Sequence, residues 1–231
     1  MDWQPLPKPA EMVETRLLEA ILTGHFPVNA SLPGERDLAA QLGVTRPTLR
    51  EALQRLARDG WIEIQHGKPT RVRDYWREGN LGVLSVLAKF PAHQSPDFVA
   101  HLLELRVLLA PEYTRQALAA GPEEVIQLLE GYADLEEDPA AFARADWNLH
   151  VLLTQRADNP VFRLLLNSFR ELYILMGEKY FAYAECRRSS RRFYAELLAC
   201  ARQGSECGAE SLARRVMEES LELWKKMQKK K

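Results

Sequence analysis

The sequence has little of what a secreted, membrane-spanning or disulfide-bonded protein needs. Only three cysteines occur in 231 residues, an odd number without the close spacing of metal ligands. We interpret Cys186, Cys200 and Cys207 as reduced thiols of a cytosolic protein. The segment from Met1 to Pro5 has an acid and a proline but no apolar signal-peptide core. No apolar run reaches the length of a membrane span, so we expect a cytoplasmic protein with no membrane partner.

Motifs that carry catalysis are also missing. The sequence contains no glycine-rich phosphate loop, no Gly-x-Ser-x-Gly turn and no Cys-x-x-Cys pair. Its 46% hydrophobic and 27% charged residues are ordinary for a soluble globular protein, and 231 residues suffice for two modest domains. We therefore predict a protein that is not an enzyme and needs no cofactor.

A strong excess of positive charge is lacking as well, since the formal net charge is −1. The charge is unevenly distributed, however. Between Arg46 and Arg73 there are seven bases and three acids, a local charge of +4. A basic patch on a nearly neutral protein is the pattern expected of a nucleic-acid-binding surface.

The first third of the chain predicts a winged helix-turn-helix domain within residues 1–75, followed by a linker at 76–80. Helical periodicity covers about 11–24, 35–42 and 45–58, and Gly43 and Asp59-Gly60 end the second and third of these helices. Alternating residues at 61–65 and 70–73 flank the turn His66-Gly67-Lys68-Pro69, which indicates a hairpin. Helix, helix, turn, helix and hairpin is the order of that fold.

Residues 81–231 predict a second domain, an all-α antiparallel helical bundle, so the fold class is mainly α. Nothing alternates with period two after residue 80, and Pro122, Pro139 and Pro160 mark helix starts. The run from Val161 to Met176 is apolar almost all round, which favours the central, buried helix of the bundle. The expected helices are 81–90, 96–120 (kinked or broken at Pro111), 122–136, 139–157, 160–182, 185–203 and 207–228.

The third predicted helix has the features of a DNA-reading helix. Arg46 and Arg50 are four residues apart near its start and so share a face, and arginine is the commonest bidentate reader of guanine. The alternative is a solvated basic helix face followed by an ordinary turn. The predicted DNA-contacting residues are Arg36, Thr45, Arg46, Thr48, Arg50, and His66, Gly67 and Lys68 at the wing tip.

Four stretches carry a resemblance to a known family. They read LPGERDLA at 32–39, GVTRPTLREAL at 43–53, LQRLARDGW at 53–61 and IQHGKPT at 64–70. They resemble the signature of the GntR family of bacterial regulators and, within it, the FadR-type branch that regulates fatty acid metabolism. The resemblance implies a homodimer that binds a pseudo-palindromic operator on double-stranded DNA, as a repressor or an activator. It also implies release of that DNA by a long-chain acyl-CoA effector.

The helical half contains candidate ligand-binding residues. Arg106 lies on an otherwise apolar helix, and its alternatives are a ligand contact or an ion pair within the bundle. Ser220 shares a face with Met217 and Trp224, and its alternative is a bond back to a carbonyl four residues earlier. The aromatic residues Tyr173, Tyr180 and Tyr194 are either core or ligand contacts.

The resemblance places an acyl chain inside the bundle and coenzyme A across Arg106, Ser220, Trp224 and Lys229. The sequence departs from the family in one place, because Met217 stands where the family has a glycine three residues before the serine. A glycine leaves room for ligand, whereas a methionine fills the space with a flexible side chain.

Two other kinds of sensor fit the sequence less well. Asp146 and His150 are four residues apart on a predicted helix and resemble part of the metal site of other GntR sensor domains. No histidine follows His150 to complete that site, so the sequence predicts no bound metal and argues against a metal-bound carboxylate as the ligand. An enzyme-like second domain would need a much longer chain or strands after residue 80.

Overall fold

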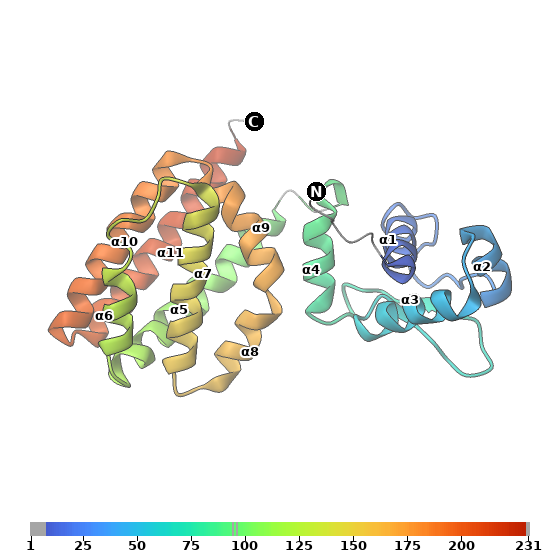
Figure 1. The fold of residues 1–231 in the computed structure, drawn as a ribbon, viewed down its shortest axis with the longest axis horizontal. Coiled ribbons are helices and arrows are strands. Elements are labelled where there is room, and N and C mark those ends of the chain that lie inside the picture. Colours follow the sequence, from blue (N-terminus) through green and yellow to red (C-terminus); the bar gives the residue numbers. More distant parts are fainter. Residues whose placement is uncertain (1–7, 94, 96, 230–231) are drawn as a thin grey trace, which may run out of the picture. The chain divides into compact units, whose positions relative to one another are not determined.

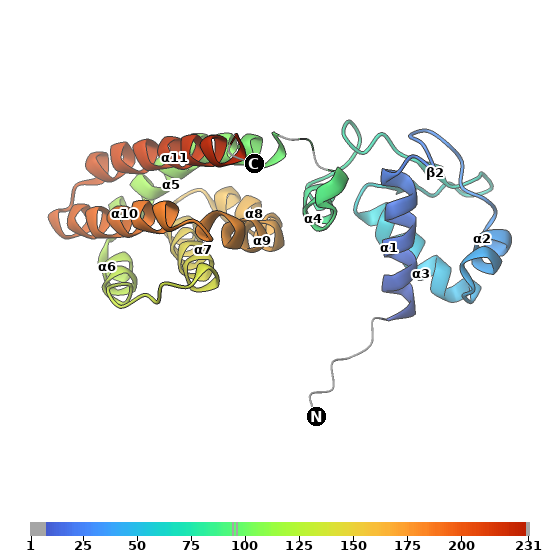
Figure 2. The ribbon, with the colours of Figure 1, turned by 90° about the horizontal axis from the view of Figure 1, so that it is seen from above.

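The computed structural model describes residues 8–93, 95 and 97–229 (Figures 1 and 2). The chain forms two compact units, the first reaching His93 and the second following it. Each is described by itself. No helix among the described residues is long and apolar enough to cross a membrane.

The first unit is a winged helix-turn-helix, which confirms the predicted fold. Helix α3 packs on α1 and α2 through side chains that are fully or almost fully buried, among them Leu49, Leu53 and Leu56. The two strands pair antiparallel, with Ile62 opposite Val72. Its elements are α1 (Pro9–Leu22), α2 (Glu35–Leu42), α3 (Arg46–Arg58), β1 (Ile62–Glu63), β2 (Arg71–Val72), α4 (Gly82–Lys89) and a 3₁₀ turn (Pro91–His93).

Helix α4 falls in this first unit, whereas the sequence limits the DNA-binding domain to residues 1–75 and starts the helical domain at 81. The segment before α4 is held against the end of α3, because the side-chain amide of Asn80 donates to the Arg58 carbonyl at 2.9 Å. Gly79 is needed there, since a Cβ at this position would lie 2.3 Å from the Tyr75 carbonyl oxygen. The segment predicted as a linker, 76–80, is thus packed against its own domain.

The second unit is an all-helical bundle, as predicted. Helix α5 runs along α11 and also contacts α7, while α10 packs on α11 and α9 packs on α7 (Figure 2). Pro111 lies inside α5, which continues through it. The helices are α5 (Phe98–Ala119), α6 (Glu123–Glu130), α7 (Pro139–Arg156), α8 (Pro160–Ser168), α9 (Arg170–Phe181), α10 (Ala184–Gln203) and α11 (Glu206–Gln228).

The apolar run from Val161 to Met176 is not the central helix, and that prediction is wrong. The chain breaks at Phe169 into α8 and α9. Helix α8 contributes no buried side chain, and Val161 and Leu164 are 52% and 65% exposed. Its apolar residues instead divide between the solvent and the wall of a cavity. The core comes mainly from α5, α7, α10 and α11, where residues such as Phe142, Leu149, Phe193 and Leu197 are fully or almost fully buried.

Candidate functional site: a nucleic-acid interface and a buried cavity

The start of α3 presents the two predicted DNA-reading arginines to solvent. Thr45 caps the helix by accepting the Thr48 backbone N–H, and the two threonine hydroxyls are 2.9 Å apart. Leu49 is fully buried, which turns its neighbours Arg46 and Arg50 outward. A helix N-terminus with two long exposed donors on one face has the geometry needed to read base edges in a major groove.

The two arginines differ in their local partners. The Nε of Arg50 donates to the Glu35 carboxylate at 2.7 Å, so α2 holds this side chain in place. Arg46 is exposed and has no acidic partner among the described residues. Arg46 can therefore contact DNA without breaking an ion pair, whereas Arg50 must give up its ion pair with Glu35 to do so.

The wing turn is the second exposed element. Gly67 adopts a left-handed conformation with φ of 72°, and His66 and Lys68 on either side of it are exposed. Arg36, at the start of α2, has a side chain that is 85% exposed and bonds only to its neighbour Asp37. Both elements offer a positive charge suited to phosphate contact.

Among the described residues, ion pairs neutralise part of the local positive charge between Arg46 and Arg73 and leave the rest unpaired. Arg55 bonds to Glu51 at 2.8 Å and lies 3.7 Å from Glu11 and Glu14. Arg58 pairs with Asp59, and Arg71 pairs with Glu63 and Glu78. The positive charge that remains without a carboxylate partner includes Arg46 and Lys68, on the exposed elements named above.

Lys68→Ala and Arg36→Ala should weaken binding to every DNA sequence alike. Each phosphate contact releases about one counterion, so each variant should reduce the slope of log affinity against log salt by about one unit. Anisotropy titrations over a salt series measure the slope. Arg58→Ala is the matched control, since Arg58 is paired at the far end of α3. If the slope is unchanged in both variants, Lys68 and Arg36 do not contact DNA phosphates.

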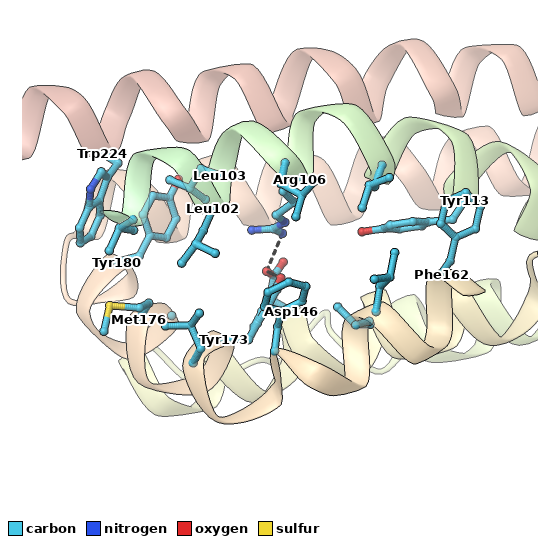
Figure 3. Close-up of a pocket in the computed structure, with 18 of the residues that line it drawn as sticks. Leu102, Leu103, Arg106, Tyr113, Asp146, Phe162, Tyr173, Met176, Tyr180 and Trp224 are labelled. Carbon is cyan, nitrogen blue, oxygen red and sulfur yellow. Dashed lines mark hydrogen bonds and ion pairs between the residues drawn. The ribbon is translucent and has the colours of Figure 1, made fainter. Parts of the chain in front are cut away.

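The second unit contains a cavity of about 130 Å³ that is almost entirely apolar (Figure 3). Helix α5 forms one wall and α8 and α9 form the other, and Trp224 of α11 lies at one end. Among the described residues of its lining, one ion pair joins Arg106 to Asp146, near the middle of the row of side chains. Other lining residues include Leu102, Leu103, Leu109, Tyr113, Phe162, Leu165, Tyr173, Met176, Gly177 and Tyr180.

Arg106 connects Asp146 to His150. Its Nη2 lies 2.8 Å from the Asp146 carboxylate and 2.5 Å from His150 Nε2. A guanidinium only donates, so Nε2 accepts, and the proton of His150 sits on Nδ1 and is donated to the Tyr113 hydroxyl at 2.7 Å. The predicted Asp146/His150 pair therefore faces an arginine, and the described residues contain no cluster of three or more metal-ligating side chains.

The network keeps fixed charges inside the bundle. Burial opposes ionisation of Asp146, but Arg106 and the hydroxyls of Tyr173 and Tyr194, at 2.5 and 3.1 Å, hold its pKa below the usual value. Burial, with Arg106 adding to it, lowers the pKa of His150 to about 3. At neutral pH the network is therefore a buried cation and anion with a neutral imidazole.

Three polar atoms in the cavity wall lack a partner. Arg106 Nε, the Tyr180 hydroxyl and the indole Nε1 of Trp224 are buried and make no hydrogen bond within the described chain. Buried donors are normally paired, so these three atoms are the places where a ligand oxygen would be most stabilising.

The predicted ligand residues differ in where they lie. Four of them line the cavity, namely Arg106, Tyr173, Tyr180 and Trp224. Tyr194 does not line it and instead donates a hydrogen bond to the Asp146 carboxylate. Met217 is buried but does not line the cavity. Ser220 donates to the Val216 carbonyl at 2.9 Å, which is the alternative considered above, and Lys229 is exposed.

Sequence reasoning missed Tyr113 and Phe162. Tyr113 follows Arg106 by seven residues and so shares its helix face, a signal that was present in the sequence. Phe162 had no comparable signal, because its position depends on the break after α8.

Comparison with known families decides the classification. The family described as bacterial regulatory proteins, gntR family, matches residues 9–72, and the FadR C-terminal domain matches residues 73–230. The chain belongs to the GntR family, in its FadR branch. It is a regulatory protein and not an enzyme.

Relatives of this GntR protein agree with that assignment. Fatty acid metabolism regulator proteins of Cronobacter sakazakii and of Escherichia coli O1:K1 / APEC are each 38% identical over 221 residues, covering 96% of this chain and 92% of the relative. A solved structure of Lar, described as controlling expression of the Listeria monocytogenes agr system, is 19% identical with a TM-score of 0.65, covering 95% of this chain and 98% of that one. The likeness to Lar shows the fold alone.

Proposed function

We propose that this protein is a cytoplasmic, DNA-binding transcription regulator of fatty acid metabolism. The exposed start of α3, with Arg46 unpaired, is the observation that carries DNA binding. The names of its 38%-identical relatives support the metabolic role. A homodimer that presents two such helices would match a pseudo-palindromic operator, because two-fold symmetry in the protein selects two-fold symmetry in the DNA.

The proposed effector is a long-chain acyl-CoA that binds the second unit and releases DNA. The apolar cavity supplies the driving force, since each buried methylene is worth about 0.8 kcal/mol. The unpaired Nε1 of Trp224 suits a ligand carbonyl or hydroxyl oxygen. The exposed Lys226 and Lys229 follow Trp224 at the end of α11, and their charge suits phosphate groups.

The cavity must enlarge to accept such a ligand. Its volume of about 130 Å³ is close to that of cavities that hold one benzene molecule. The Arg106–Asp146 ion pair crosses it from α5 to α7, so a long chain must displace or bend around this pair (Figure 3). A ligand that fits only a rearranged bundle has the differential affinity for two states that a switch requires, typically about 1–3 kcal/mol.

Oleoyl-CoA should bind the purified protein and lower its affinity for DNA, whereas coenzyme A alone and free oleate should do so much less. The DNA probe is a site selected from a random pool by the protein itself. Intrinsic fluorescence reports binding, and Trp224→Phe identifies the contribution of Trp224. Anisotropy of the labelled DNA reports release.

Met217→Gly and Met217→Leu form a matched pair for this experiment. Removing the buried side chain should create room beside the cavity and tighten oleoyl-CoA binding, whereas leucine should leave it near the wild-type value. The effector is another ligand if oleoyl-CoA neither binds nor releases DNA and Met217→Gly does not rescue it. The DNA-binding role would then still stand.

A further inference from the structure

The cavity is a long slot along one face of α5. Leu102, Arg106, Leu109 and Tyr113 line it in succession, at the spacing of a single helix face. Eleven residues of helix rise about 16 Å, which sets the length of the slot. Figure 3 shows the row from Trp224 and Met176 at one end to Tyr113 and Phe162 at the other.

The two ends differ in chemistry. Trp224, with its unpaired indole N–H, marks one end, and the exposed Lys226 and Lys229 follow it in the chain. The other end is closed by Tyr113 and Phe162, whose rings meet edge-on with centroids 5.7 Å apart. A ligand with a polar head and an apolar tail is therefore oriented with its head at Trp224 and its tail toward the ring pair.

The two rings of the closed end are held to different degrees. Tyr113 is 5% exposed, and His150 holds its hydroxyl at 2.7 Å. Phe162 is half-buried on α8, a helix whose neighbouring residues Val161 and Leu164 face solvent. Tyr113 is thus a fixed stop, and Phe162 is the part of the wall that a substitution can move without disturbing the core.

We propose that Phe162, packed edge-on against Tyr113, determines the longest acyl chain that the slot accommodates. This inference rests on the proposed acyl-CoA effector. An extended chain advances about 1.2 Å for each bond, by analogy with extended backbone, so once the Arg106–Asp146 ion pair is displaced a slot of about 16 Å matches roughly 14 carbons. Methylenes beyond that length meet the Phe162 ring and contribute no further burial.

The test is a series of saturated acyl-CoAs from octanoyl to arachidoyl, all below their micelle concentrations. For wild type, affinity should rise about fourfold for each added methylene and then level off. Phe162→Ala should move the levelling point to a longer chain by at least one even-numbered step. Phe162→Trp should move it to a shorter chain. Leu164→Ala, on the solvent side of α8, is the matched control and should keep the wild-type profile.

The results separate this inference from the proposed function. A levelling point that stays at the same chain length in Phe162→Ala and Phe162→Trp would overturn the role of Phe162 while leaving acyl-CoA as the effector. If wild type binds no member of the series, the proposed effector is wrong and the inference falls with it. A loss of affinity for all chain lengths in Phe162→Ala, with an unchanged levelling point, would also contradict the inference.

Discussion

Arg46→Ala and Arg50→Ala should each weaken binding to a cognate DNA site by about 1–3 kcal/mol while leaving binding to scrambled DNA nearly unchanged. Both side chains leave the exposed N-terminal turns of α3, and the guanidinium fork pairs with two acceptors of guanine at once. The measurement is the ratio of affinities for a selected site and its scrambled version at one salt concentration.

The control on the same helix is Arg58→Ala. It removes the same charge from the last turn, where Asp59 already neutralises it, so the affinity ratio should hold. If Arg46→Ala and Arg50→Ala both keep the wild-type ratio, base recognition lies elsewhere on the protein. Glu35→Gln adds a separate test, because it frees Arg50 and should strengthen binding to the selected site.

Asp146→Ala should lower the free energy of unfolding of the second unit by about 3–5 kcal/mol. The substitution leaves the Arg106 guanidinium without a carboxylate inside the bundle and takes an acceptor from Tyr173 and Tyr194. Native-state hydrogen exchange of peptides from α7 and α10 localises the effect to this unit.

Glu137→Ala provides the comparison for Asp146. Glu137 also accepts from two side chains, Arg187 and Arg191, at 2.8 and 2.9 Å, but it is 62% exposed. Its loss should cost far less stability than the loss of Asp146, because solvent screens its ion pairs. Replacing both buried charges, as Arg106→Met with Asp146→Leu, should recover most of the stability. If Asp146→Ala and Glu137→Ala lower the free energy of unfolding equally, burial does not strengthen the interactions of Asp146.

The DNA-binding unit was largely predictable because its signals are local. The Thr45 cap, the turn at Gly43 and the spacing of Arg46 and Arg50 all lie within one short stretch. The partner of Arg50 was not predictable in the same way, since Glu35 is fifteen residues earlier and meets it only through the angle between α2 and α3. Counting charges in the sequence likewise predicted that the patch is positive. Only the ion pairs in the structure show which arginines and lysines are left to contact DNA.

The second unit was predicted less well, because its candidate site is built from residues far apart in the sequence. Arg106 was chosen as an arginine on an apolar helix, but its partner Asp146 is forty residues away. The sequence argued against a metal at Asp146 and His150, but it could not show that the Arg106 guanidinium is the cation that contacts both side chains. The run from Val161 to Met176 misled because apolar composition does not distinguish a core from a cavity wall, and the break at Phe169 has no glycine or proline to mark it.

The internal neutralisation of Arg55, Arg58 and Arg71 bears on how the protein finds its target in a genome. These three arginines of the described chain already have carboxylate partners, so we expect sequence-independent attachment to be weak and brief at physiological salt. Any operator competes with about a million or more ordinary sites, and time spent on them reduces the free pool. A regulator with short stays on ordinary DNA needs fewer copies per cell to keep its operator occupied. If the proposed effector releases the protein, the same weak attachment would return it to solution instead of leaving it bound to neighbouring DNA.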